Sequence, residues 1–217
     1  MPRTSAVEAP DGSQRRATFQ RARSHETKRA LVQAAMALWR TNGYAKTTVA
    51  DICRAAGVSR ALFYFYFPAK EDVLFEVGLL STRAARKTIH QHLSGDYDVD
   101  AVIASALRSL ERSMARNPRD LIVETILEGY RQEQRILAGE RAADPDADMF
   151  GELFARAKAD GKLADSIDTD HLSRLAQMHV SEGVRHWALS GFGDRSFAEV
   201  VARDIAALIA GFNHGAK

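Results

Sequence analysis

The sequence predicts an all-α protein of about nine helices, with a small N-terminal domain and a larger C-terminal one. Apolar residues recur at intervals of three and four along most of the chain, which is the spacing of an amphipathic helix. Glycine, proline and asparagine residues separate these segments, and such residues commonly end helices. No segment shows sustained alternation of apolar and polar residues, so we expect no β-sheet.

The start of the chain is expected to contain a disordered basic arm followed by a first helix. Residues 1–23 show no periodic apolar face and are rich in polar residues and arginine. The arginines are Arg3, Arg15, Arg16, Arg21 and Arg23. We expect the helix to begin at Ser24, with Thr27 as an alternative N-cap, and to end at Asn42 and Gly43.

The segment from Thr47 to Asp72 predicts two short helices joined by a tight turn. Thr47 and Thr48 lie where a helix N-cap is expected, and Gly57 can adopt the positive φ that ends the helix. Ser59 is a second N-cap. The inner apolar positions are Val49, Ile52, Cys53, Ala56, Leu62, Phe63 and Phe67, and the outward positions of the second helix are Arg60, Ala61 and Tyr64. This is the helix-turn-helix layout, in which the second helix enters the major groove of DNA.

The same segment resembles the TetR family of bacterial transcription regulators. The matching residues are Thr47-Thr48-Val49-x-x-Ile52, Ala55-Ala56-Gly57-Val58-Ser59 and Phe63-Tyr64-x-Tyr66-Phe67-x-x-Lys70-Glu71-Asp72. The resemblance implies that residues 24–69 form a three-helix DNA-binding domain. It also implies that residues 70–217 form a helical domain for ligand binding and dimerisation.

Carried onto matching positions, the resemblance implies that eight residues contact DNA: Thr47, Thr48, Ser59, Arg60, Ala61, Tyr64, Tyr66 and Lys70. Thr48 and Ser59 would bind phosphates from the N-terminal ends of their helices. Arg60 would bind guanine bidentately or contact phosphate only, and Ala61 would touch a thymine methyl group. Tyr64 would reach phosphate and base edges, and Tyr66 and Lys70 would hold the DNA backbone.

The charge of the chain is unevenly distributed. The net charge is +2, but residues 1–60 contain 11 Lys and Arg against 4 Asp and Glu. Residues 61–217 contain 19 against 24. This asymmetry predicts a nucleic-acid-binding face at the N-terminal end only. The basic arm would follow phosphates or enter a minor groove, or it would be a solvated tail that adds only non-specific attraction.

The rest of the chain predicts six more helices. Pro68, Glu71 and Asp72 suit the N-terminus of a long helix that runs to about His92. Further helices are expected at about 98–116, 118–138, 147–160, 168–190 and 196–212. Between the second and third of these lies a polar loop, residues 139–148.

The last two helices have broad apolar faces that allow two interpretations. The residues in question are Leu175, Phe197, Val201, Ile205, Leu208 and Phe212. They would form either the core of one subunit or the interface of a homodimer, built as a four-helix bundle. The family resemblance favours the dimer, because two recognition helices related by a two-fold axis read a palindromic operator.

The resemblance also implies a small-molecule pocket in the larger domain, whose effector would release the protein from double-stranded DNA. Candidate lining residues are Met114, Tyr130, Met149, Phe150, Phe154, Met178, His179 and Trp187. Methionine and aromatic side chains suit an adaptable apolar pocket, although each of these residues also suits a plain core. The sequence identifies neither the effector nor the operator.

Several other classes of protein find little support. The sequence lacks a phosphate-binding loop, a G-x-S-x-G elbow and an H-E-x-x-H motif, so we expect neither an enzyme nor a cofactor. His179 and His186 lie two helical turns apart, too far to share one metal ion. Cys53 is expected to be a small buried hydrophobic residue. No apolar run is long enough to span a membrane or serve as a secretory signal, so a cytoplasmic location is expected.

These features together predict a homodimeric, ligand-responsive DNA-binding repressor. One alternative is a DNA-binding protein of the same fold that a partner protein controls, or that has no small ligand. A closed and filled core in the larger domain would support that alternative. A second is an enzyme or ligand carrier with an incidental helix-turn-helix.

Overall fold

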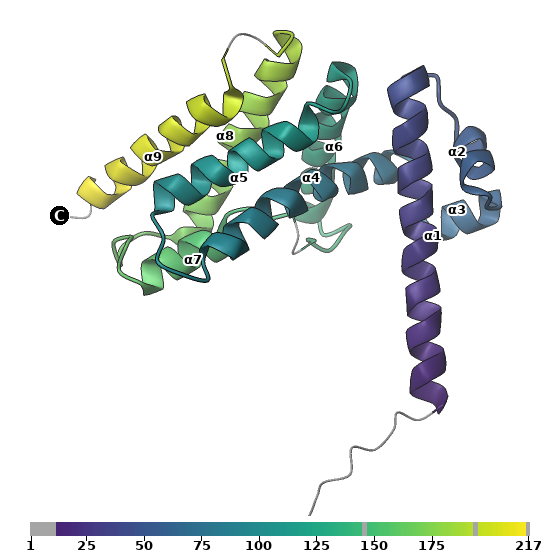
Figure 1. Ribbon diagram of the computed structural model, residues 1–217, viewed down its shortest axis with the longest axis horizontal. Coiled ribbons are helices and arrows are strands. Elements are labelled where there is room, and N and C mark those ends of the chain that lie inside the picture. The colour runs from purple at the N-terminus through teal and green to yellow at the C-terminus, as the bar shows by residue number, and fades with distance from the viewer. Residues whose placement is uncertain (1–11, 145–146, 193–194, 216–217) are drawn as a thin grey trace, which may run out of the picture.

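The computed structural model describes residues 12–144, 147–192 and 195–215. This part of the chain folds into nine helices and contains no strand, which confirms the predicted all-α class (Figure 1). The helices are α1 (Gly12–Asn42), α2 (Val49–Ala56), α3 (Arg60–Tyr66), α4 (Lys70–His92), α5 (Val99–Met114), α6 (Arg119–Leu137), α7 (Gly151–Ala159), α8 (Thr169–Leu189) and α9 (Phe197–Gly215). Within the described residues, none of these helices is long and apolar enough to cross a membrane.

Helix α1 begins earlier than the sequence predicted. It starts at Gly12 rather than Ser24, so the second half of the expected disordered arm is helical. Residues 1–11 of that arm lie outside the described residues. The added segment is rich in arginine, glutamine and alanine, which favour helix. Extending an existing helix also avoids the cost of nucleating a new one, so this segment needs no apolar face. Figure 1 shows the start of α1 projecting beyond the other helices.

The described residues form two hydrophobic cores, and α4 takes part in both. The smaller core combines α1, α2 and α3 with the first turns of α4, including Val73, Leu74 and Val77. The larger core continues from Ala85 and Ile89 on the same helix through α5 to α9. Helix α4 therefore joins the two cores mechanically, and Figure 1 shows it crossing from α1 into the bundle.

The predicted helices after residue 70 are all present, with small shifts at their ends. The largest shift is at α7, which begins at Gly151 rather than residue 147. Asp148 explains this start, because its Oδ1 accepts hydrogen bonds from the backbone N–H groups of Phe150 (3.1 Å) and Gly151 (3.0 Å). A side chain that caps the first free N–H groups fixes where a helix begins.

Half of the predicted dimer residues are buried inside the chain itself. Phe197, Val201 and Ile205 are at most 4% exposed and pack in the larger core, where α9 lies against α5 and α8. Their assignment to a dimer interface is therefore wrong, because covered side chains offer no surface to a partner. Leu175, Leu208 and Phe212 are half-buried and keep part of their surface exposed.

Gly183 allows α8 and α9 to approach closely. A Cβ atom added at Gly183 would lie 2.5 Å from Val201 Cγ2, which is too short for a van der Waals contact. A Cβ atom at Gly129, in the middle of α6, would meet no atom within 4 Å.

We expect Gly183→Ala to lower the free energy of unfolding by about 1–3 kcal/mol, because the new methyl group overpacks the α8–α9 contact. Gly129→Ala is the matched control and should be neutral or stabilising by up to about 1 kcal/mol, since alanine favours helix. Chemical denaturation of both variants measures the difference. A Gly183→Ala protein as stable as the Gly129→Ala protein would contradict the close packing.

Candidate nucleic-acid interface and pocket

The first helix of the motif begins and ends as its sequence predicts. Thr48 is the N-cap of α2: its Oγ1 accepts from the backbone N–H of Asp51, and its own backbone N–H donates to Asp51 Oδ2. This reciprocal pair is a capping box. The Thr48 hydroxyl also donates to Asp51 Oδ2 at 2.6 Å, and this bond, together with the backbone one, lowers the pKa of Asp51. Gly57 ends α2 in the left-handed conformation, with φ of 66°, and Val58 N–H closes the turn on Cys53 O at 3.0 Å.

The second helix of the motif rests on a buried apolar face. Ser59 is its N-cap and accepts a hydrogen bond from Leu62 N–H at 3.1 Å. Phe63 and Phe67 are buried in the smaller core together with Ile52 and Cys53 of α2. Cys53 is buried as predicted, and burial raises the pKa of its thiol. A buried, protonated thiol is a poor nucleophile, so the side chain serves packing.

The opposite face of α3 is open to solvent. Arg60, Ala61 and Tyr64 are exposed, as the sequence predicted for DNA-reading positions. Phe65 is 77% exposed on the same short helix and was missed. Its position could have been found, because it follows Ala61 by four residues and therefore shares its face. Thr48 and Ser59, at the starts of the two helices, are exposed as well.

Two of the eight predicted DNA contacts are engaged within the protein. Thr47 is 2% exposed, and its hydroxyl donates to Gly43 O at 2.9 Å, so its assignment to DNA contact is wrong. Lys70 Nζ donates to the carbonyls of Tyr44 (3.1 Å) and Thr47 (3.2 Å) and lies 4.1 Å from the centre of the Tyr44 ring. Lys70 therefore ties the loop before α2 to the start of α4. Tyr66 is half-buried.

The larger domain contains a cavity of about 600 Å³. Its walls are α4, α5, α6 and α8, together with the loop that follows α6. Of the eight predicted pocket residues, Met114, Tyr130 and Met178 line it. The rest do not: Met149, Phe150, Phe154 and Trp187 are buried in the larger core, and His179 Nε2 lies 3.3 Å from Asp204 Oδ2. The cavity wall instead includes polar residues that sequence reasoning missed.

A buried polar pair in α6 lies beside this cavity. Glu128 and Gln132 are 0% exposed, and Gln132 Nε2 donates to Glu128 Oε1 at 2.7 Å. Arg131 Nη1 lies 3.2 Å from the other carboxylate oxygen of Glu128. Gln132 itself lines the cavity. The only sequence signal for this pair was the four-residue spacing of two polar residues on one helix.

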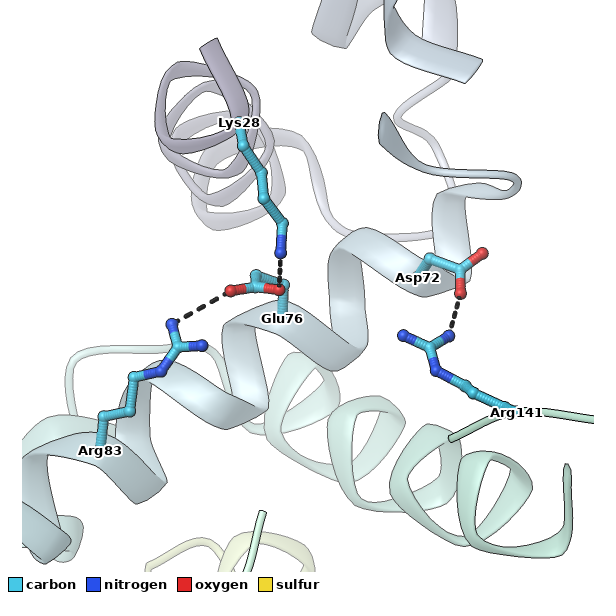
Figure 2. A network of polar contacts seen from close by, with 5 residues as sticks. All are labelled: Lys28, Asp72, Glu76, Arg83 and Arg141. Carbon is cyan, nitrogen blue, oxygen red and sulfur yellow. Dashed lines mark hydrogen bonds and ion pairs between the residues drawn. The ribbon is translucent and has the colours of Figure 1, made fainter. Parts of the chain in front are cut away.

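Ion pairs connect the loop that follows α6 to the smaller core by way of α4 (Figure 2). Lys28 of α1 and Arg83 of α4 both point at the carboxylate of Glu76. Near the start of α4, Asp72 Oδ2 accepts from the backbone N–H of Ala69, while its Oδ1 lies 2.8 Å from Arg141 Nη1.

Arg141 belongs to the loop after α6 and also contacts the cavity wall. Its guanidinium lies 5.3 Å from the ring centre of Phe75, which lines the cavity. The side chain of Asp72 is 8% exposed and that of Arg141 is 39% exposed, so the carboxylate is shielded from water while the guanidinium is partly exposed. The loop residues that line the cavity are thus tied to the first turn of α4.

Three comparisons relate the chain to known proteins. Residues 31–77 match the family model of bacterial regulatory proteins, tetR family. The chain is 22% identical over 149 residues to the HTH-type transcriptional regulator UidR of Escherichia coli K12, covering 69% of this chain and 75% of UidR. It is 44% identical over 48 residues to the HTH-type transcriptional regulator EthR of Mycolicibacterium smegmatis, 22% of each protein.

The fold gives the same relationship over most of the chain. It is similar to the crystal structure of Thermus thermophilus FadR, a TetR family transcriptional repressor in complex with lauroyl-CoA. The TM-score is 0.70 at 25% identity, covering 84% of this chain and 93% of that one. The matched family segment spans α2, α3 and most of the smaller core. The chain therefore carries the tetR-family segment over residues 31–77 and is similar to TetR-family transcriptional regulators over most of its length.

Proposed function

We propose that this regulator represses transcription in the cytoplasm by binding a palindromic operator as a homodimer, and that a small molecule in the cavity releases it. The observation that carries the proposal is the double role of α4, which is buried in the core beneath the exposed face of α3 and also forms a wall of the cavity. A ligand that favours a different position of α4 changes the position of α3.

The cavity argues against the alternative of a regulator without a small ligand. A filled larger domain would favour control by a partner protein, whereas a cavity of about 600 Å³ lies in the size range of small-molecule sites. The Thermus relative is in complex with lauroyl-CoA, which supports a small-molecule ligand for a protein of this fold. Acyl-CoA itself does not suit the cavity of this chain. Its cavity is lined by four carboxylates, those of Glu133, Asp144, Asp148 and Asp170, against one arginine, Arg174, and these would repel the phosphates of coenzyme A.

The exposed side of α8 and α9 is the proposed dimer interface. Leu175 of α8 and Leu208 and Phe212 of α9 leave apolar surface uncovered there. His179 and Asp204 bridge the two helices, with 3.3 Å between Nε2 and Oδ2. A dimer is needed because one short recognition helix buries too little surface for specificity.

Replacing the half-buried apolar residues by arginine should break the dimer. We expect Leu175→Arg with Leu208→Arg to yield a monomer in analytical ultracentrifugation and to abolish operator binding, because charges would be buried at the interface. Leu137→Arg is the control, since Leu137 is 81% exposed at the far end of α6. A double variant that stays dimeric would place the interface elsewhere.

Arg60 is the residue proposed to read a base. Arg60→Ala should weaken binding to the operator by about 1–3 kcal/mol and relax the preference at one base pair of each half-site. The operator is first obtained by selection from random duplex DNA at a stated salt concentration, and affinities are then measured by fluorescence anisotropy.

Arg112→Ala is the matched control, because it removes the same charge from an exposed position on α5. If Arg60→Ala weakens all sequences alike, Arg60 contacts phosphate only. If it changes neither affinity nor preference, it does not contact DNA.

The Arg141–Asp72 ion pair is proposed to hold α4 in the DNA-binding position. Arg141→Ala should lower operator affinity about 2- to 5-fold without effector, a modest change because the pair is partly exposed. Arg156→Ala is the control, since it removes a similar pair to Asp160 from α7. Equal operator affinities for the two variants would exclude this role of Arg141.

A further inference from the structure

Two glutamine oxygens in the cavity wall have no hydrogen-bond partner among the residues that the structure describes. Gln132 on α6 is completely buried and lines the cavity, and its Oε1 has no hydrogen-bond partner. Gln177 on α8 lines the same cavity, and its Oε1 is likewise buried without a partner. Buried carbonyl oxygens are almost always paired in folded proteins, so two unpaired ones beside one cavity mark positions where a ligand or a water molecule would donate. Both oxygens are covered, so a donor reaches them only after a small side-chain movement.

The orientation of the Gln132 amide is fixed by its neighbour. Its Nε2 donates to Glu128 Oε1 at 2.7 Å. A carboxylate only accepts hydrogen bonds, so rotating the amide by half a turn would place two acceptors against each other. The nitrogen must face Glu128, and the oxygen is left without a donor.

The hydroxyl groups of the cavity wall add acceptors rather than donors. Thr125 Oγ1 donates to Leu121 O at 2.7 Å, Thr82 Oγ1 to Gly78 O at 3.4 Å, and Ser173 Oγ to Asp148 Oδ1 at 2.6 Å. A hydroxyl has one proton, so each of these can offer a ligand only its lone pairs.

Apart from the amide nitrogens of the same two glutamines, the donor groups of the cavity wall are already bonded or exposed. Ser81 shares its hydrogen bond with Ser113, and Ser181 is bonded to Tyr130. Arg174 and Tyr130 are exposed. The inner wall is otherwise apolar, with Leu79, Leu110, Met114 and Ile126.

We propose that the effector is a neutral or cationic molecule with an apolar body, and that its hydroxyl, amine or N–H groups donate one proton each to Gln132 Oε1 and Gln177 Oε1. This inference rests on the proposed role of the cavity as the effector site. An anionic group is excluded from the inner wall, because it would bring further lone pairs to oxygens that already lack a donor. The carboxylates around the cavity also repel an anionic ligand.

Two isomeric probes distinguish hydrogen-bond donation by the ligand from simple filling of the cavity. Octan-1-ol and 1-methoxyheptane have the same composition and similar size, but only the alcohol donates a hydrogen bond. We expect isothermal titration calorimetry on the full chain to give about 3- to 10-fold tighter binding of octan-1-ol, the factor that one hydrogen bond contributes. Octanoate should bind more weakly than either isomer. Equal binding of the two isomers, or a preference for octanoate, would overturn the proposal.

Variants assign the preference to the two amides. Gln132→Met and Gln177→Met keep the side-chain length and remove one acceptor each. Octan-1-ol donates one proton, so the double variant should bind octan-1-ol no more tightly than 1-methoxyheptane, and the single variants show which amide accepts that proton. Gln134→Met is the control, because Gln134 is exposed on the same helix as Gln132. If Gln132→Met unfolds after losing its bond to Glu128, the half-buried Gln177 still provides the test.

A cavity-filling variant distinguishes failure of this proposal from failure of the proposed function. Met114 is 5% exposed and lines the cavity, so Met114→Trp should block both isomers. If Met114→Trp blocks binding but the isomers bind equally, the cavity is a ligand site and the donor proposal is wrong. If neither isomer binds saturably, or Met114→Trp leaves binding unchanged, both ideas fail. If octan-1-ol is preferred but leaves operator binding unchanged, the release mechanism alone is wrong.

Discussion

The arrangement of the molecule depends on one helix being buried in two cores. The first turns of α4 pack against α1, α2 and α3, and its later turns pack against the larger bundle. A helix of 23 residues transmits a displacement along its axis, because its backbone hydrogen bonds resist bending. The two domains are therefore not free to tumble independently. Movement of the wall formed by Phe75 and Gly78 also moves Val73, Leu74 and Val77, which share the smaller core with Phe63 of α3.

The charged groups on α4 also favour one particular position of the helix. Glu76 and Asp72 have side chains that are 12% and 8% exposed, and each faces a cation from another part of the chain (Figure 2). A carboxylate so far removed from water is costly without its partner, so the helix favours positions that keep these pairs. Close apolar packing alone would permit neighbouring positions of similar energy.

Local features of the sequence were enough to predict the helix-turn-helix, whereas the cavity required the fold. The caps at Thr48 and Ser59 and the left-handed Gly57 depend on residues within one turn, and each lies as expected. The roles of the two adjacent threonines were harder to predict, because only one of them can be the N-cap. The structure shows that Thr48 is the cap and that the Thr47 hydroxyl is bonded inside the protein. Phe150, Phe154 and Trp187 were assigned to a pocket by residue type, but packing between distant helices places them in the core. The same packing turns Gln132 and Gln177 towards the cavity, which no local pattern indicates.

Because Cys53 is buried, labelling of its thiol reports local opening of the small domain. This residue is the sole cysteine of the chain, and it lies between the two helices of the motif, 4% exposed, with Sγ 3.9 Å from Ser59 O. A thiol reagent reaches this sulfur only when α2 and α3 separate. At a reagent concentration where reclosing is faster than modification, the labelling rate reports the free energy of that local opening. The small domain can therefore be followed on its own within the intact chain, even though it shares a helix with the rest.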